Sequence, residues 1–331
     1  MGTSYQVKWD HRGMEVSVER IADNTQLILS ELNQLMSTYL EDSELNRFNQ
    51  TPTGIWFKLS PDTLEVIDKA IQVSEQSDGA FDITVGELVN LWGFGPDLKP
   101  VKLPNDEQLN QVLSSVGYQY LSLDKGTGKI LKLKPVYVDL SAVAKGYAVD
   151  KVAEYLQNAG VSAFLVEVGG ELRSFGRKPD GSAWRVAIET PVPGNPALGQ
   201  RNIHNVIELE NMGLATSGDY RNFYEENGIR YSHTIDPRTG RPITHRLASV
   251  TVLHQQAGYA DAWATALMVM GEEQGYDLAV ENNLAAFFIV KETDVGSKTK
   301  DSKEGGIDNE KQLFTELVTP AFRESVRVAG E

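Results

Sequence analysis

The sequence predicts an α+β fold, because helical and strand patterns interleave without the regular βαβ rhythm of a doubly wound parallel sheet. Strand patterns dominate the second half of the chain, and no segment of about 20–50 residues repeats, which argues against solenoids and propellers. The 331 residues are enough for one large domain or for two intimately packed lobes with a substantial core.

Three helices are expected in the first half, where apolar residues recur at the spacing of one helical face. An extended stretch, Met1–Val18, precedes them, with alternating Tyr5, Val7 and Trp9. The helices are expected over Ala22–Tyr39, from Ser60-Pro61-Asp62 to near Asp78-Gly79, and over about Ala142–Asn158. A hydroxyl residue before proline, as at Ser60-Pro61, is typical of a helix start.

Short strands are expected to alternate with one further helix in the second half. The strands are Ala163–Val168, Trp184–Glu189, Ile203–Leu209, Leu247–His254 and Ala285–Val290. The helix is Ala260–Met270, which Gly271 should end. Residues 291–309 are polar and glycine-containing, so they are expected to form a flexible surface loop. Too little chain follows that loop to form a second core, so residues 1–331 are predicted to be a single domain.

Composition excludes several classes of function. The net charge of −15 argues against non-specific nucleic-acid binding, and it means that an anionic ligand needs a local cation or metal. The absence of cysteine excludes disulfides, thiolate metal sites and cysteine nucleophiles. No apolar run reaches the ~18 residues needed to span a membrane.

The segment Arg230–Ile243 is the most informative part of the chain, because it combines a histidine, an acid and three arginines with turn residues. His233 lies near Ser232 and Asp236 in this segment. A histidine near its intrinsic pKa can take a proton from a hydroxyl at neutral pH. A structural role for His233 is the alternative, and the local chemistry does not separate the two.

Asp261 and Thr265 are four residues apart at the start of a predicted helix, so they share one helical face. A carboxylate and a hydroxyl are ligand types that Mg²⁺ accepts, together with carbonyls, water and substrate phosphate. The alternative is that Asp261 caps the helix and Thr265 packs in the core.

Two glycine-rich segments could form the walls of a ligand site. In Gly79–Gly86, glycines would let the backbone approach a ligand, and Asp82 could bond a ring N–H. The alternative is a helix stop followed by a strand, with Asp82 satisfying a turn. Leu91–Pro96 carries two aromatic residues that suit either a wall around a flat ring or a core plug.

Charged residues beside three further turns could bind an anion or a cation. In Val138–Tyr147, Asp139 precedes a helix and Lys145 lies in its first two turns, where anions are attracted. Glu167–Glu171 places two acids around a glycine pair, and Thr216–Tyr220 is turn-like with hydroxyls that could reach a phosphate. The structural alternatives are an N-cap at Asp139 or the following serine, a solvated Lys145, and acids that only flank a turn.

In their order along the chain, these segments resemble the ApbE family of FAD:protein FMN transferases. The matching segments are Met1–Tyr5, Ser37–Tyr39 with Ser43–Asn49, Gly79–Gly86, Asp139–Tyr147, Glu167–Gly170, Ala215–Tyr220, His233–Pro242 and Asp261–Gly271. The resemblance implies two closely packed α+β lobes with mixed or antiparallel sheets, flanking helices and a cleft for FAD.

The resemblance also implies a reaction and its residues. With Mg²⁺, such an enzyme cleaves the FAD diphosphate, attaches FMN to a threonine or serine hydroxyl of a partner flavoprotein, and releases AMP. The residues that would contact FAD are Met1, Tyr39, Ala80, Phe81, Asp82, Asp139, Lys145 and the backbone near Ile235. Asp261, Thr265 and the Ala142 carbonyl would hold Mg²⁺, and His233 would be the base.

The partners implied are FAD and acceptor subunits of membrane redox complexes, of the sodium-translocating NADH:quinone reductase or Rnf type. Family members usually carry a signal peptide and a lipid-attachment cysteine before the Met-Gly-Thr motif. The chain begins at that motif, so the full-length protein is expected to be periplasmic and anchored to the inner membrane by an N-terminal lipid. A leaderless cytoplasmic member is the alternative.

Two other functions remain open at this point. A hydrolase would use the same site, with water in place of the acceptor hydroxyl, and would give FMN and AMP. A non-catalytic FAD-binding lipoprotein would need neither the base His233 nor the metal ligands Asp261 and Thr265. The sequence does not identify the acceptor protein or the oligomeric state.

Overall fold

The computed structural model describes residues 2–12, 16–95, 103–192, 202–219, 223–226, 229–292 and 314–328. A seven-stranded antiparallel sheet forms the centre of the larger lobe, in the order β1-β5-β6-β9-β14-β15-β16. The strands are β1 (Tyr5–Trp9), β5 (Phe164–Val168), β6 (Glu171–Phe175), β9 (Gly213–Gly218), β14 (Leu247–His254), β15 (Ala285–Lys291) and β16 (Phe314–Val318).

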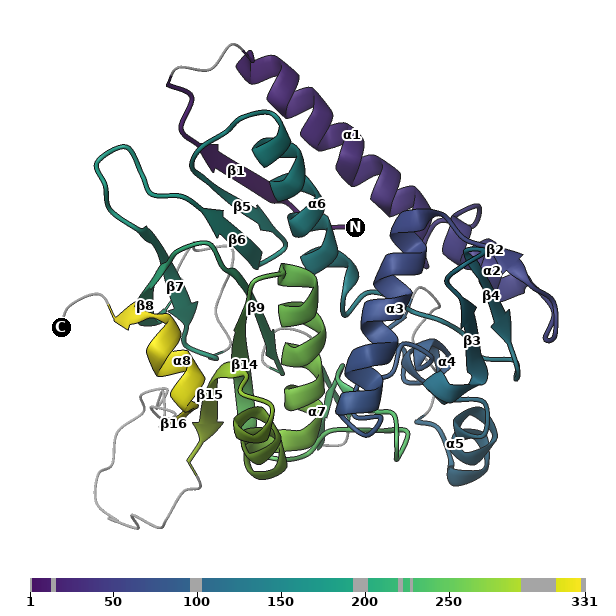
Figure 1. Cartoon of the computed structure of the whole chain (residues 1–331). Coiled ribbons are helices and arrows are strands. Elements are labelled where there is room, and N and C mark those ends of the chain that lie inside the picture. The colour runs from purple at the N-terminus through teal and green to yellow at the C-terminus, as the bar shows by residue number, and fades with distance from the viewer. Residues whose placement is uncertain are drawn as a thin grey trace, which may run out of the picture.

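Both faces of this sheet are covered. Helices α6 (Ala144–Asn158) and α7 (Ala257–Glu281) pack on one face, as Figure 1 shows. The other face packs against a three-stranded sheet and a short helix. These elements are β7 (Trp184–Glu189), β8 (Ile203–Leu209), β17 (Arg327–Val328) and α8 (Pro320–Ser325). Seven of the eight residues of β14 are therefore buried, because side chains on both of its faces contact apolar neighbours.

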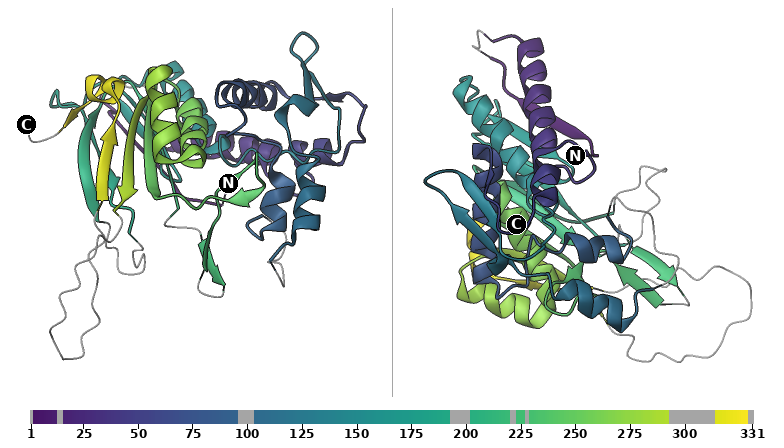
Figure 2. Two further views of the ribbon diagram at one scale, coloured as in Figure 1. Left: turned by 90° about the horizontal axis from the view of Figure 1, so that it is seen from below. Right: turned by 90° about the vertical axis from the view of Figure 1, so that its right-hand side faces the viewer.

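A smaller lobe lies beyond the helices of the large one (Figures 1 and 2). Its helices are α1 (Val18–Met36), α2 (Glu44–Gln50), α3 (Pro61–Gln76), α4 (Gly86–Leu91), α5 (Asp106–Leu113) and the 3₁₀ turn η1 (Tyr118–Tyr120). Its sheet has the order β2 (Phe57–Lys58), β4 (Lys129–Lys132), β3 (Leu121–Asp124). In the left panel of Figure 2, α7 lies between the large sheet and α3, so one helix contacts both lobes.

Two hairpins complete the described structure: β10 (Phe223–Glu226) with β11 (Ile229–Ser232), and β12 (Ile235–Asp236) with β13 (Arg241–Pro242). Helix α7 packs against β12, so the second hairpin lies beside the helix that carries Asp261. None of the described helices is long and apolar enough to cross a membrane.

The predicted α+β class is confirmed, and three predicted strands, those now called β7, β8 and β14, have the predicted limits. The start of α3 is also confirmed, because the hydroxyl of Ser60 accepts from Thr63 N at 3.3 Å and Pro61 is the first helical residue. Several boundaries were wrong. Helix α1 begins at Val18 and ends at Met36, so the extended stretch ends earlier and Tyr39 lies outside the helix.

Three other predictions need correction. Helix α7 begins at Ala257 and continues past Gly271, whose φ of 80° makes a kink and not an end. Gly79–Gly86 is not a strand, since residues 79–84 lie in turns, Val85 makes an isolated bridge with Tyr137 and Gly86 begins α4. Thr216–Gly218 belongs to strand β9 and not to a turn. The predicted loop 291–309 lies outside the described residues, except that Lys291 ends β15 and Glu292 follows it.

Candidate active site

A cavity of about 1440 Å³ opens between the two lobes, which is larger than the roughly 300–1000 Å³ of a drug-sized ligand pocket. All of the predicted site residues that the structure describes line it. They are Tyr39, Ala80, Phe81, Asp82, Asp139, Ala142, Lys145, His233, Ile235, Asp261 and Thr265. Met1 lies outside the described residues. Residues from widely separated segments thus converge on one cavity.

An ammonium group and two carboxylates form the charged centre of the cavity. The Lys145 Nζ lies 3.0 Å from Glu171 Oε1 and 3.7 Å from Asp261 Oδ1. Burial lowers the pKa of Lys145, but the charges of Asp261 and Glu171 outweigh it, so this pKa is raised above its ordinary value. Lys145 therefore stays protonated at neutral pH and serves as a fixed positive charge.

Glu171 is a site residue whose role the sequence did not reveal. Its side chain is buried, and burial together with the charge of Asp261 raises its pKa to about 8, although Lys145 acts in the opposite direction. Within the described residues, its Oε2 has no hydrogen-bond partner. Glu167 also lines the cavity, and its Oε1 accepts from Gly170 N at 2.7 Å in the turn between β5 and β6, which matches the alternative that the acids flank a turn.

The three predicted metal ligands line the cavity where the segment before α6 and the first turns of α7 approach each other. Asp261 Oδ2 accepts from Gly146 N at 3.0 Å, and Thr265 Oγ1 lies 3.2 Å from Ser217 Oγ. In a regular helix, Gly146 N would bond to the carbonyl of Ala142. Because it bonds to Asp261 instead, no backbone N–H in the described ranges donates to the Ala142 carbonyl.

This set of oxygen atoms fits a magnesium ion. A carboxylate, a hydroxyl and a backbone carbonyl without a backbone donor are hard ligands, and Mg²⁺ commonly completes its six positions with water and substrate phosphate. In the described part of the chain there is no group of three histidines or acids that could hold a metal alone. An ion bound at Asp261 would therefore rely on the neutral oxygen atoms of Thr265 and Ala142, with water or substrate phosphate completing its positions.

A glycine allows the two helices to approach this closely. A Cβ atom on Gly146 would lie 2.3 Å from the Ala257 carbonyl oxygen and 2.8 Å from Asp261 Cβ. Both are well inside van der Waals contact, so a side chain at this position would push α7 away from α6. The spacing between Lys145 and Asp261 thus depends on the absence of a side chain between them.

The loop Ala80–Asp82 forms another wall. Asp82 Oδ1 accepts from Thr84 N at 2.7 Å, and Asp82 Oδ2 accepts from Tyr118 N at 2.7 Å. Burial raises the pKa of Asp82, while these hydrogen bonds oppose the increase. The contacts match the structural alternative, in which Asp82 satisfies a turn, yet the residue also lines the cavity. Asp139 N donates to Ile83 O at 2.7 Å, which ties this loop to the segment before α6.

Asp139 and Asp261 are not helix caps, contrary to the structural alternatives. Asp139 Oδ1 accepts from Ser141 N at 2.8 Å, whereas Val143 is the N-cap of α6. Asp261 is the fifth residue of α7, one turn beyond its start. Tyr39 is 70 % exposed at the edge of the cavity, so its ring is available to a flat ligand.

An aromatic residue packs against His233, which lies between β11 and β12. The ring of Phe94 packs edge-on against His233, with 6.3 Å between the ring centroids, and its centroid lies 5.2 Å from that of Tyr224. Phe94 lines the cavity, whereas Trp92 is buried and donates from Nε1 to Gly240 O at 2.8 Å. Of these two aromatic residues, Phe94 therefore lines the cavity and Trp92 belongs to the core.

Comparison with known proteins identifies close relatives. The model of the ApbE family matches residues 1–288. The FAD:protein FMN transferase of Vibrio cholerae is 45 % identical over 298 residues, which are 90 % of this chain and 87 % of the relative. The enzyme of the same description from Haemophilus influenzae is 44 % identical over 307 residues, covering 91 % and 87 %.

Solved structures are similar over nearly the whole chain. The flavin transferase ApbE from Vibrio cholerae has a TM-score of 0.84 and 41 % identity, covering 98 % of this chain and 96 % of that one. The apo form of the Pseudomonas stutzeri flavinyl transferase ApbE has a TM-score of 0.83 and 40 % identity, covering 98 % and 94 %. The two-lobed α+β architecture is therefore shared with these enzymes.

Proposed function

The chain belongs to the ApbE family and is a flavin transferase that takes FAD as its substrate. From this premise, we propose how its cleft carries out the reaction. The observation that carries the proposal is the convergence of Lys145, Asp261, Thr265 and His233 on one cavity that the loop Ala80–Asp82 also lines. A positive charge, the proposed metal ligands, the proposed base and the proposed wall for a flat ring therefore share one cavity.

In the proposed reaction, the isoalloxazine ring lies near Tyr39 and Phe81, and the diphosphate lies beside Lys145. An acceptor hydroxyl attacks the phosphorus on the FMN side, the bond between the two phosphates breaks, and AMP leaves with the bridging oxygen. His233 takes the hydroxyl proton. Because Lys145 stays protonated, it stabilises the negative charge that develops on the phosphates.

Asp261, Thr265 and the Ala142 carbonyl are proposed to hold Mg²⁺, which would neutralise phosphate charge and orient the leaving group. A metal suits a chain with a net charge of −15, because an anionic diphosphate would otherwise be repelled. Asp261 is oriented for this role by its hydrogen bond from Gly146 N, which leaves Oδ1 directed toward Lys145.

The acceptor and the location of the protein are also proposals. They rest on the resemblance to a family whose partners are subunits of sodium-translocating NADH:quinone reductase or Rnf-type complexes. We propose such a subunit as the acceptor, a periplasmic location with a lipid anchor on the full-length protein, and one catalytic unit over residues 1–331. Fractionation of cells that express the full-length protein tests the location, and recovery in the cytoplasm would contradict it.

The test of function is to incubate the protein with FAD, Mg²⁺ and a candidate acceptor subunit and to measure the acceptor by mass spectrometry. A covalent addition of FMN at a threonine or serine is expected, with one AMP released for each FMN attached. The runner-up, an FAD diphosphatase, would release FMN and AMP while every candidate acceptor stays unmodified.

A further inference from the structure

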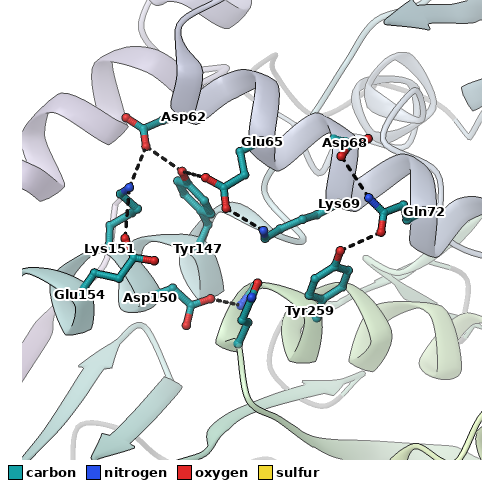
Figure 3. Close-up of polar contacts among 12 residues, drawn as sticks. Asp62, Glu65, Asp68, Lys69, Gln72, Tyr147, Asp150, Lys151, Glu154 and Tyr259 are labelled. Atoms are coloured by element: carbon teal, nitrogen blue, oxygen red, sulfur yellow. Dashed lines mark hydrogen bonds and ion pairs between the residues drawn. The ribbon is translucent and has the colours of Figure 1, made fainter. Parts of the chain in front are cut away.

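The first N–H groups of helix α7 are not capped by a side chain from the residue that precedes the helix. Its N-cap residue, Gln256, makes no side-chain capping bond. Instead, Asp150 on α6 accepts from Ala257 N through Oδ1 and from Gly258 N through Oδ2, both at 2.9 Å. Figure 3 shows Asp150 directed at the start of α7. A carboxylate at this place satisfies two unpaired N–H groups and interacts favourably with the helix dipole.

Asp150 is itself held in place. Its side chain is buried, and Arg173 Nη1 on β6 donates to Oδ1 at 2.8 Å. Three donors from two elements therefore bind this carboxylate. Since a buried charge without partners is costly, this arrangement fixes both the rotamer of Asp150 and the position of the helix end that it binds.

The clamped end of α7 leads directly to the proposed metal ligands. Asp261 and Thr265 lie four and eight residues after Ala257, so all three share one helical face. In the reverse direction, Asp261 Oδ2 accepts from Gly146 N near the start of α6. Two carboxylates thus link the same pair of helices, and each binds the N-terminal turn of the other's helix.

We propose that Asp150 is a positioning residue for the metal site. By fixing the start of α7 against α6, it sets the distance from Asp261 and Thr265 to the Ala142 carbonyl and to Lys145. The inference rests on the proposed magnesium site. Groups that orient metal ligands without touching the metal typically change metal affinity or activity by about 10–100-fold when they are removed.

The test uses Asp150→Asn in the full chain. The asparagine side chain has the same shape but no charge, and its NH₂ group faces one of the N–H donors that Asp150 accepts from. The Mg²⁺ concentration that gives half of the Mg²⁺-induced rise in Tm, measured without FAD, should increase about tenfold or more. The Kd of FAD, measured by fluorescence without Mg²⁺, should stay close to that of the wild type.

Two further variants separate positioning from stability. Asp150→Asn combined with Gln256→Asp restores a local helix cap, so it should recover much of the lost Tm but not the Mg²⁺ affinity. Asp62→Asn is the matched control. Asp62 Oδ1 accepts from Tyr147 Oη at 2.7 Å and ties α3 to α6, and Asp62 lies on α3, away from the start of α7 (Figure 3). Its Mg²⁺ response should stay that of the wild type.

If Asp150→Asn had a lower Tm but bound Mg²⁺ with the affinity of the wild type, the inference would be overturned, while the proposed metal site would be unaffected. Recovery of both quantities in the double variant would do the same, because Asp150 would then be only a cap. No Mg²⁺ response in the wild type, with or without FAD, would instead overturn the metal site and the inference together.

Discussion

At the scale of single residues, the centre of the cavity is an ammonium group that contacts the carboxyl groups of two acids. Lys145 lies between Glu171 and Asp261, and its raised pKa means that it does not serve as a base near neutral pH. His233 lines the same cavity and is the proposed base. The sequence marked Lys145, Glu171 and His233 as candidates, but their convergence on one cavity required the fold.

His233→Ala should slow FMN transfer by about 10²–10⁴-fold, the usual cost of losing a general base. FAD and Mg²⁺ should still bind, since neither the charged centre nor the metal ligands change. The measurement is the pH dependence of the transfer rate, in which the wild type should show a limb in the histidine range that the variant lacks. Near-normal rates in the variant, together with loss of that limb in Lys145→Ala, would move the role of base to Lys145.

Glu171→Gln should change how stability depends on pH. The pKa of Glu171 is raised from 4.5 in the unfolded chain to about 8 in the fold, so the folded state binds more protons between these values. The free energy of unfolding therefore decreases as pH rises from 4.5 to about 8, and the glutamine variant should lack this decrease. Tm measured against pH in EDTA tests it, and parallel curves for the two proteins would contradict the assignment.

At the scale of elements, the site lies where α6 and α7 meet. The sequence predicted both helices, but it could not predict that they touch at Gly146 or that α7 begins at Ala257. Strands β10 to β13 were missed because they are too short for a clear alternation, whereas β9 was missed because Gly213–Gly218 shows no regular alternation and pairs with strands distant in sequence. Such contacts cannot be read from local pattern.

Gly146→Ala should destabilise the protein by about 1–3 kcal/mol, the usual cost of overpacking, and weaken Mg²⁺ binding by displacing Asp261. Gly258→Ala is the matched control, because a Cβ there meets its nearest atom, Tyr147 N, at 3.4 Å. The control should be neutral or slightly stabilising, since alanine favours a helix over glycine by up to about 1 kcal/mol. Urea denaturation measures the free energy of unfolding of both variants. Equal values would show that the close approach of α6 and α7 at Gly146 is not needed for stability.

At the scale of the whole molecule, the two lobes form one large cavity, and α7 connects them. The sequence predicted the α+β class, and its resemblance to a family predicted the cleft and the residues that line it. Without that resemblance, the local pattern predicted a structural role for Ala80, Phe81 and Asp82. These residues lie far along the chain from Asp261, so the sequence alone did not indicate that they line the same cavity. Their approach depends on the packing of the smaller lobe against the larger one.

FAD should stabilise the folded chain, because a ligand that contacts both lobes binds only when they are assembled. At 100 times its Kd, a ligand selective for the folded state adds about 2.7 kcal/mol to the free energy of unfolding. A rise in Tm with FAD concentration measures it, and AMP alone, which lacks the flavin that Tyr39 and Phe81 would contact, should give a smaller rise. No rise at high micromolar FAD would contradict binding in the cavity.

The most direct test of the account is the rate of covalent FMN transfer to an acceptor subunit by Asp261→Asn, compared over a range of Mg²⁺ concentrations with the wild type. Asp277→Asn is the control, since Asp277 is an exposed residue farther along α7 that does not line the cavity. We expect Asp261→Asn to lose transfer at every Mg²⁺ concentration while it still binds FAD, and Asp277→Asn to match the wild type. Unchanged transfer by Asp261→Asn across these concentrations would show that the metal site at α7 does not carry the reaction.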